Sequence, residues 1–552
     1  MLRRVWRPIL ATTAVGTSAY LYHTYSQKKQ YSGGFELQVK TKGADGKREM
    51  STQKFPLLTV TGLEERLKAH ATSHASPRPN GITWRHTTAQ LASNDPIEDT
   101  VSYAIIRRDP TPDTPDGDLL FFTVMDGHAG PYTSRLLAKT LIPAVALQLS
   151  ELMGEPNSFV PKKGTLDNLK SWIYPSKTSP IPFDADPKYV SNAIQSAFAM
   201  ADSEIINAPL RLLIENMQAN PPPKGVEPDL SQHPMAMAAM LPALSGSCAL
   251  LAYIDTARRD LYVACTGDCR AVAGIWEEDT EGKGTWRVEV LSEDQTGRNP
   301  KELARMQSEH PRDEEASVIQ RGRVLGGLEP TRAFGDARYK WSGDLQQLLN
   351  RVFLKGNNHP MRSTPPLLKT PPYVTSQPVV THRKLSFLPP ASPSSENTTS
   401  SDVADKSKSE LRFIVLATDG LWDQLSSSEV VALVGGHLAG LSGSVPKAQL
   451  SSLIPTTLSS DPSAQTVEGK DKRRRDDGGA WAFVEDNVST HLIRNAFGGA
   501  DQRKLRRLLS IPAPVSRNYR DDVTVTVVWW EGGKDEPKQE TFNLQTPLKA
   551  KL

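Results

Sequence analysis

The chain has 552 residues, of which 38% are hydrophobic, enough for one large domain or two ordinary ones. Its 65 Lys and Arg residues against 62 Asp and Glu residues give a formal net charge of +3, and this balance offers no chain-wide argument for binding nucleic acid or lipid. The three cysteines (Cys248, Cys265 and Cys269) lie in apolar stretches without metal-ligand spacing, so neither a disulfide framework nor a zinc site is predicted, and a reducing compartment is expected.

Residues 1–30 have the composition of a mitochondrial import presequence. They are rich in Ser, Thr and Tyr and contain no acidic residue. Their basic residues are Arg3, Arg4, Arg7, Lys28 and Lys29. The stretch 8–27 has no charged residue and is about long enough to cross a bilayer, so a membrane anchor is the alternative, with an unstructured tail as the third reading. Import into the mitochondrial matrix or intermembrane space is favoured.

Residues 536–552 are expected to form a C-terminal tail. The last three, Ala550-Lys551-Leu552, approximate the small-basic-Leu signal that directs proteins to peroxisomes. A peroxisomal location is therefore kept as a minor alternative to the mitochondrion.

Between these ends, 31–80 is expected to be an N-terminal linker and 81–535 a single domain. Apolar runs rich in β-forming residues predict strands, and apolar residues at helical spacing predict amphipathic helices. The expected strands are 101–107, 119–125, 247–254, 261–273, 412–418 and 523–530, and the expected helices are 134–149, 187–204, 300–308, 429–438 and 488–497. This mixture of buried strands and amphipathic helices is typical of an α+β layered sandwich.

Three stretches are expected to be insertions into this domain: 157–244, 386–409 and 440–479. The segment 221–230 and the second and third insertions are dense in Ser, Pro, Gly and charged residues. Such segments cannot bury enough apolar surface to offset the entropy lost on ordering. We interpret 221–230, 386–409 and 440–479 as surface loops.

Acidic residues gather where the predicted strands begin or end. Asp126-Gly127 and Asp419-Gly420 each follow a strand directly, and Asp521 precedes the last strand. Hard cations prefer carboxylate oxygens, and the carbonyl of a glycine can turn toward the same ion. A single Asp-Gly after a strand is more often a simple turn. Because the pattern recurs, the sequence predicts a divalent-cation site.

Further acidic residues occupy comparable junctions. Glu98-Asp99 lies just before the strand at 101–107, and Asp268 and Asp336 each follow a glycine. They enlarge the set of candidate metal ligands.

Taken in order, these motifs resemble the protein phosphatase 2C family of metal-dependent serine/threonine phosphatases, over about 89–530. The matching stretches are Pro-Ile-Glu-Asp at 96–99, Asp-Gly-His-Ala-Gly at 126–130, Ser-Gly-Ser at 245–247, Gly-Asp-Cys-Arg at 267–270, Leu-Ser-Glu-Asp at 291–294, Arg-Ala-Phe-Gly-Asp at 332–336, Asp-Gly-Leu-Trp-Asp at 419–423 and Arg-Asp-Asp at 520–522. The resemblance implies a four-layer αββα sandwich: two packed antiparallel sheets flanked by helices, with metals in a cleft at one edge.

The resemblance also implies a ligand set for two Mg²⁺ or Mn²⁺ ions. The implied ligands are Asp126, which would bridge the ions, the carbonyl of Gly127, Asp419, Asp521, and Glu98 acting through water. Two cations lower the pKa of a shared water and neutralise charge on the phosphoryl oxygens. Such a site needs no nucleophilic Ser or Cys.

Four more residues take roles from the same resemblance. Asp268 and Asp336 match positions that help to hold a third metal. His128 matches the general acid that protonates the departing Ser or Thr oxygen, the alternative being a histidine that only supports the site. Arg323 matches an arginine near the substrate cleft, although an arginine on a polar loop is ordinarily solvated or ion-paired.

Several stretches resemble one branch of this family, the mitochondrial pyruvate dehydrogenase phosphatase catalytic subunits. They are Gln-Leu-Ala-Ser-Asn at 90–94, 339–346, 370–373, 490–494, and the Arg-Asp-Asp at 520–522 in place of the commoner Arg-Asp-Asn. The implied substrate is the E1 α component of pyruvate dehydrogenase within its complex. Alternatives are another mitochondrial or peroxisomal phosphoprotein, or a catalytically silent regulatory module, against which the complete set of carboxylates argues.

One position departs from the wider family. Most members have an arginine four residues before the glutamate that matches Glu98, and this arginine clamps the substrate phosphate. Here the position holds Asn94. Arg85 and Arg323 are candidates to replace the clamp, and the sequence leaves the choice open.

Overall fold

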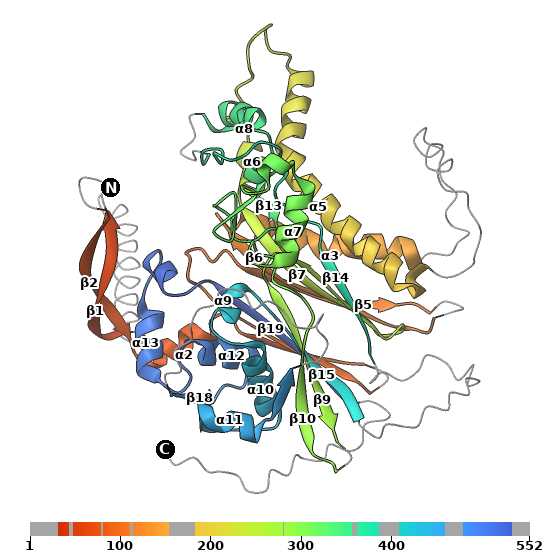
Figure 1. Cartoon of the computed structure of the whole chain (residues 1–552), viewed down its shortest axis with the longest axis vertical. Helices are drawn as coiled ribbons and strands as arrows, with labels where there is room; N and C mark the ends of the chain where they lie inside the picture. The colour runs from red at the N-terminus through yellow and green to blue at the C-terminus, as the bar shows by residue number, and fades with distance from the viewer. Residues whose placement is uncertain are drawn as a thin grey trace, which may run out of the picture.

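The computed structural model describes residues 31–42, 48–78, 81–110, 114–153, 183–279, 281–355, 361–385, 408–458 and 478–532. Two antiparallel sheets form the centre of the molecule, and helices cover the outer face of each (Figure 1). The predicted presequence or anchor at 1–30 and the C-terminal Ala550-Lys551-Leu552 lie outside the described residues.

The first sheet runs in the order β17-β10-β9-β15-β19-β4-β3. Its strands are antiparallel except for the pair β10 and β17. Their bounds are β3 Thr72–Pro77, β4 Thr83–Leu91, β9 Arg270–Glu278, β10 Gly284–Val290, β15 Lys408–Ala417, β17 Thr456–Leu458 and β19 Val523–Glu531.

The second sheet runs in the order β14-β8-β7-β6-β5, with β13 paired to β7. All of its strand pairs are antiparallel. The strands of this sheet are β5 Thr100–Arg108, β6 Gly117–His128, β7 Gly246–Asp255, β8 Asp260–Thr266, β13 Phe334–Gly335 and β14 Val379–Lys384.

Strand β6 explains the continuous apolar run in the sequence. Leu120, Phe122 and Val124 pack between the two sheets, against residues of β9, β15 and β19. Phe121 and Met125 point the opposite way, toward the helices α3 and α5. Side chains alternate between the faces of a strand, so a strand that is covered on both sides must be apolar at successive positions.

The helices form the two outer layers (Figure 1). α3 Tyr132–Met153 and α5 Pro187–Ala219 cover the second sheet, and α2 Val60–Lys68, α10 Ser427–Leu438, α12 Val488–Phe497 and α13 Gln502–Ser510 cover the first. The remaining helices are α6 Ala236–Leu244, α7 Pro300–Glu309, α8 Gly343–Leu349, α9 Asp419–Trp422 and α11 Lys447–Leu453. This arrangement confirms the predicted four-layer α+β sandwich.

Helix α3 is the one helix among the described residues that is long and apolar enough to cross a membrane. Its buried side chains Leu137, Leu141, Val145 and Leu149 pack into the core with β6, β7 and α5. These contacts identify α3 as a core helix of the sandwich.

The expectation that 31–80 is a linker is wrong. This segment contains the hairpin of β1 Tyr31–Lys42 and β2 Arg48–Leu58, the helix α2 and the edge strand β3. Leu63 and Leu67 of α2 are almost fully buried in the core that also contains α13. Because this segment contributes only a few apolar side chains to a core built elsewhere, its local composition gives little sign of them.

Two other expectations need correction. The insertion 440–479 is not a loop throughout: it contains β16 Gly443–Pro446, α11 and β17. Leu450 and Ile454 are buried in the hydrophobic core between the first sheet and its helices. The expected single strand 261–273 is two strands, β8 and β9, which belong to different sheets. The change of sheet occurs at Gly267, whose φ of +106° favours glycine and where a Cβ would lie 2.3 Å from Cys248 Sγ.

Candidate active site

Asp126 lies near the end of β6 and meets acidic side chains from distant segments. Burial, followed by the charges of Asp99, Asp419, Asp268 and Asp522, raises the pKa of Asp126 well above its usual range. We call these five residues the carboxylate cluster. The cluster therefore contains three of the predicted ligands, Asp126, Asp268 and Asp419, and two acids, Asp99 and Asp522, to which the family resemblance gave no ligand role.

Asp99 is one of the unassigned acids, and its side chain is buried. Its Oδ2 accepts hydrogen bonds of 2.9 Å from the hydroxyls of Thr418 and Thr524. Burial, and then the charge of Asp522, raises the pKa of Asp99 well above its usual range. The sequence signal that points to Asp99 is its position directly after Glu98 in the Pro-Ile-Glu-Asp motif at 96–99.

Asp522, the second unassigned acid, holds the loop that carries Asn94 and Glu98. Its carboxylate accepts hydrogen bonds of 2.9 Å from the main-chain N–H of Asn94, the side-chain amide of Asn94 and the main-chain N–H of Glu98. Both oxygens thereby orient the loop beside the cluster. Asp522 and Asn94, which the sequence analysis treated separately, are therefore in direct contact.

Asp521, a predicted ligand, is partly exposed, at 31% of its side chain. Its Oδ1 accepts a hydrogen bond of 2.7 Å from the N–H of Asp522 and forms an ion pair with Arg517 of the short 3₁₀ helix η7 Val515–Asn518. In this arrangement, Asp521 faces a cation supplied by the protein itself.

Glu98 and Gly127 lie side by side. A Cβ at Gly127 would be 2.1 Å from the carbonyl oxygen of Glu98, so the position requires glycine. The Oε1 of Glu98 accepts a hydrogen bond of 2.8 Å from the N–H of Gly130. Burial raises the pKa of Glu98, although Gly130, Arg517 and His128 oppose the shift. Glu98 is therefore positioned next to the loop that follows Asp126.

His128 and Asp336 form a pair. His128 Nε2 lies 2.6 Å from Asp336 Oδ2. A Cβ at Gly246, the residue opposite His128 on β7, would lie 2.1 Å from His128 Nε2 and 2.3 Å from Asp336 Oδ2. Burial alone would lower the pKa of His128, but Asp336, Asp268 and Glu98 outweigh burial and raise it. The arrangement favours a protonated imidazole that can donate a proton.

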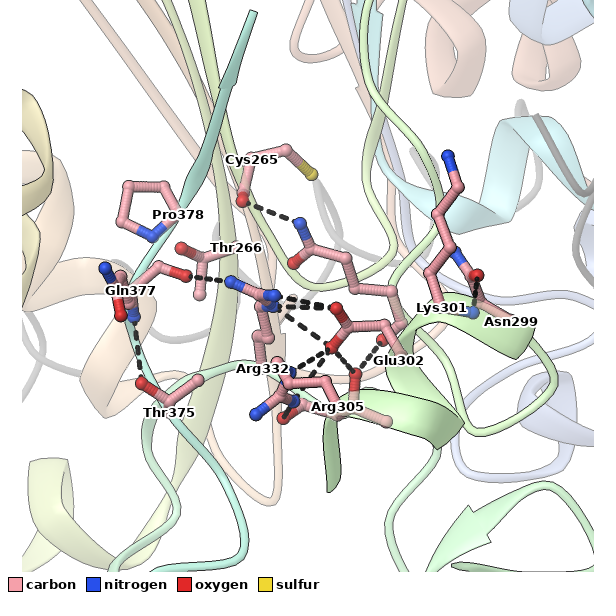
Figure 2. A network of polar contacts seen from close by, with 12 residues as sticks. Cys265, Thr266, Asn299, Lys301, Glu302, Arg305, Arg332, Thr375, Gln377 and Pro378 are labelled. Atoms are coloured by element: carbon pink, nitrogen blue, oxygen red, sulfur yellow. Dashed lines mark hydrogen bonds and ion pairs between the residues drawn. The ribbon is translucent and has the colours of Figure 1, made fainter. Parts of the chain in front are cut away.

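A second polar network anchors the segment that leads to Asp336 (Figure 2). Glu302 of α7 accepts hydrogen bonds from Arg332, Arg305 and the hydroxyl of Thr331. Arg332 also donates to the carbonyl of Gln377 at 2.7 Å. The network fixes one end of the motif at 332–336, whose other end contacts His128.

The two arginines proposed from the sequence form ion pairs with acids outside the carboxylate cluster. Arg323 pairs with Glu329 and donates to the carbonyl of Gly327, within its own turn. Arg85 pairs with Glu531. Leu91 is at the end of β4 that is nearer the cluster, and Arg85 is six residues away from it, or about 20 Å along the strand. The partners of Arg323 are those of the ion-paired alternative that the sequence left open.

The donor set of the cluster fits a hard divalent cation, because it consists of carboxylates whose charges affect one another. In the described part of the chain, no three His, Cys, Asp or Glu side chains converge on one ligand point. Asp521 and Asp522 instead engage Arg517 and loop N–H groups. Asp521 could act as a metal ligand only by exchanging Arg517 for the cation.

Comparison with known proteins identifies the family. The family model "Protein phosphatase 2C" matches residues 225–440. A protein phosphatase 2C homolog from Schizosaccharomyces pombe is 32% identical over 495 residues, which cover 88% of each chain.

Two relatives carry the name [pyruvate dehydrogenase [acetyl-transferring]]-phosphatase 1, mitochondrial. The Saccharomyces cerevisiae protein is 32% identical over 505 residues, covering 89% of this chain and 76% of that protein. The human protein is 32% identical over 510 residues, covering 88% of this chain and 85% of that protein. With these matches and the four-layer sandwich, the chain belongs to the protein phosphatase 2C family and is a protein serine/threonine phosphatase.

Proposed function

We propose that this chain hydrolyses phosphoserine and phosphothreonine with the help of two divalent cations at the carboxylate cluster, and that it dephosphorylates the E1 α component of pyruvate dehydrogenase, reactivating the enzyme. The observation that carries the chemistry is the set of neighbouring acids, Asp99, Asp419, Asp268 and Asp522, whose charges raise the pKa of Asp126. The substrate assignment is supported by identity of 32% with mitochondrial pyruvate dehydrogenase phosphatases over most of the chain.

Protein phosphatases of this family depend in general on Mg²⁺ or Mn²⁺. In our proposal the ions are held by Asp126, the carbonyl of Gly127, Asp419, Asp521 and, through water, Glu98, and a third ion would involve Asp268 and Asp336. When bound, such cations supply an acidified water and neutralise charge on the phosphoryl oxygens. In this proposal the fold carries these residues at or next to the ends of strands from both sheets.

Proton transfer is the part of the reaction that we assign to side chains. His128 would protonate the departing serine or threonine oxygen, because its pKa is raised by Asp336 and it sits two residues from Asp126. Asp336 would orient the ring. Glu98 would hold the loop at 130 through the Gly130 N–H and thereby keep His128 near the cluster.

A mitochondrial location follows from the same proposal. The two relatives named above are mitochondrial, and the composition of 1–30 suits an import presequence. Fusion of the first 35 residues to a fluorescent protein tests this address, and a parallel fusion of the last 12 residues tests the peroxisomal alternative.

The decisive experiment uses the purified full chain and two substrates, phosphorylated pyruvate dehydrogenase complex and a generic phosphothreonine peptide. Phosphate release is measured with Mg²⁺, with Mn²⁺ and with excess chelator. We expect release from both substrates, dependent on metal, together with recovery of dehydrogenase activity. Peptide hydrolysis without release from the complex would reject the substrate, and metal-independent hydrolysis would reject the mechanism.

A further inference from the structure

Asn94 is committed to structural hydrogen bonds and cannot act as a phosphate clamp. Its side-chain amide donates to Asp522 Oδ2 at 2.9 Å and to Glu98 Oε2 at 3.3 Å. An amide nitrogen has two N–H groups, so both are used. The remaining carbonyl oxygen of the side chain would repel a phosphate dianion. The cluster needs a cation from elsewhere to receive an anionic substrate.

Arg517 is the cation that the fold supplies at this place. Its guanidinium forms the ion pair with Asp521, and its charge opposes the rise in the pKa of Glu98. The side chain remains 40% exposed. A guanidinium has five N–H donors in a planar fork, which leaves donors for a second oxyanion.

The backbone around Arg517 is tied to the loop of Asn94. Ser516, its neighbour, donates its hydroxyl to the carbonyl of Ser93, and the hydroxyl of Ser93 donates to the carbonyl of Arg520 at 2.8 Å. The side chains of Ser93 and Ser516 are almost fully buried. The short helix η7 and the loop at 93–98 therefore form one fixed unit, and a cation carried by η7 keeps a defined position at the rim of the site.

We propose that Arg517 binds the phosphate of the substrate and takes the place of the arginine that is missing at position 94. This inference rests on the proposed phosphatase activity, although not on the identity of the substrate protein. In the structure, Arg517 pairs with Asp521. When Asp521 engages a cation, Arg517 exchanges its carboxylate partner for the phosphoryl oxygens, to which an arginine binds bidentately.

The test compares Arg517→Gln and Arg517→Lys with Arg503→Gln, which removes an exposed charge from the neighbouring helix α13. Phosphopeptide hydrolysis is measured at saturating Mn²⁺ or Mg²⁺, together with inhibition by inorganic phosphate. We expect Arg517→Gln to raise KM, and the inhibition constant of phosphate, by about 10- to 100-fold, the range for a lost charge-assisted hydrogen bond. Arg517→Lys should recover part of the loss, and Arg503→Gln should match wild type.

A purely structural role for Arg517 predicts a different result. If Arg517 only holds Asp521 in place, its loss weakens metal binding, measured by calorimetric titration of Mn²⁺, and leaves phosphate inhibition at saturating metal unchanged. Either unchanged phosphate inhibition or an unchanged KM in an active, folded variant overturns the inference. A wild-type protein that hydrolyses no phosphopeptide with metal would instead overturn the proposed function.

Discussion

Two acidic sites within the same domain meet the cost of burying negative charge in opposite ways. At Glu302, burial would raise the pKa, but Arg332 and Arg305 outweigh it and lower the pKa to about 2. At Asp126, burial and four neighbouring acids raise the pKa well above its usual range. The first site is neutralised by the protein itself (Figure 2), whereas at the second the neighbouring acids favour neutralisation of Asp126 by a proton or by a bound cation.

This difference separates scaffold from active site. A buried carboxylate with internal cations contributes to folding and is complete without a ligand. Carboxylates that raise one another's pKa repel one another in the ionised state, and such strongly perturbed acids gather at functional sites. The two sites should therefore respond differently to mutation, metal and pH.

The largest expected effect is on stability, at the internally neutralised site. Glu302→Gln leaves Arg332 buried without its carboxylate and should lower the free energy of unfolding by about 3–5 kcal/mol. Chemical denaturation monitored by circular dichroism measures the loss. Glu309→Gln is the matched control, because Glu309 pairs with the same Arg305 but is 52% exposed, and should cost less than about 1 kcal/mol. Equal losses in the two variants would contradict the comparison.

At the carboxylate cluster, mutation should affect activity rather than stability. Asp126→Asn should lower phosphatase activity by more than about 100-fold, since even indirect partners of a metal are worth about 10- to 100-fold. The metal-free protein should be no less stable, because a repulsive charge is lost. Steady-state assays and thermal melting in chelator measure the two quantities, with the exposed Asp116→Asn as control. A variant that stays fully active would remove Asp126 from the proposed ligands.

Metal should stabilise the wild-type fold through the cluster alone. At ten times its dissociation constant, a ligand that binds only the folded state adds about 1.4 kcal/mol. Thermal melting with and without Mg²⁺ or Mn²⁺ should show this increase for wild type and for Glu302→Gln. Asp126→Asn should show little or none. An increase of the same size in Asp126→Asn would mean that the cation binds elsewhere.

The smallest effect is a dependence on pH that belongs to Glu302. Its pKa is about 2 in the folded protein against an ordinary value of 4.5, so the unfolded chain takes up the proton first as the pH falls. Its contribution to stability is full above about pH 4.5 and is lost as the pH falls toward about 2. The difference in unfolding free energy between wild type and Glu302→Gln, measured in chelator from pH 7 to pH 3, should shrink accordingly. A difference that is constant with pH would contradict the assignment.

Much of the fold and part of the candidate site could be predicted from the sequence. The apolar run that became β6 had to be a strand covered on both faces, and Asp126-Gly127 at its end marked the site. A strand that is buried on both faces has apolar residues at consecutive positions, and the end of a strand can be recognised from the residues next to it. The roles of helix α2 and of Asp522 were not visible, because each depends on partners far away in the chain: α2 on α13, and Asp522 on the loop at 93–98.

The sequence by itself determined the family, the layered architecture and most of the acids, because motifs and periodicity are local properties. Only the tertiary structure decided which charges face one another. It placed Arg517 against Asp521, joined Asn94 to Asp522, and left Arg85 and Arg323 with other partners. Electrostatic interactions act over a few ångströms of space, so their balance at a site depends on how distant segments pack and not on their order in the chain.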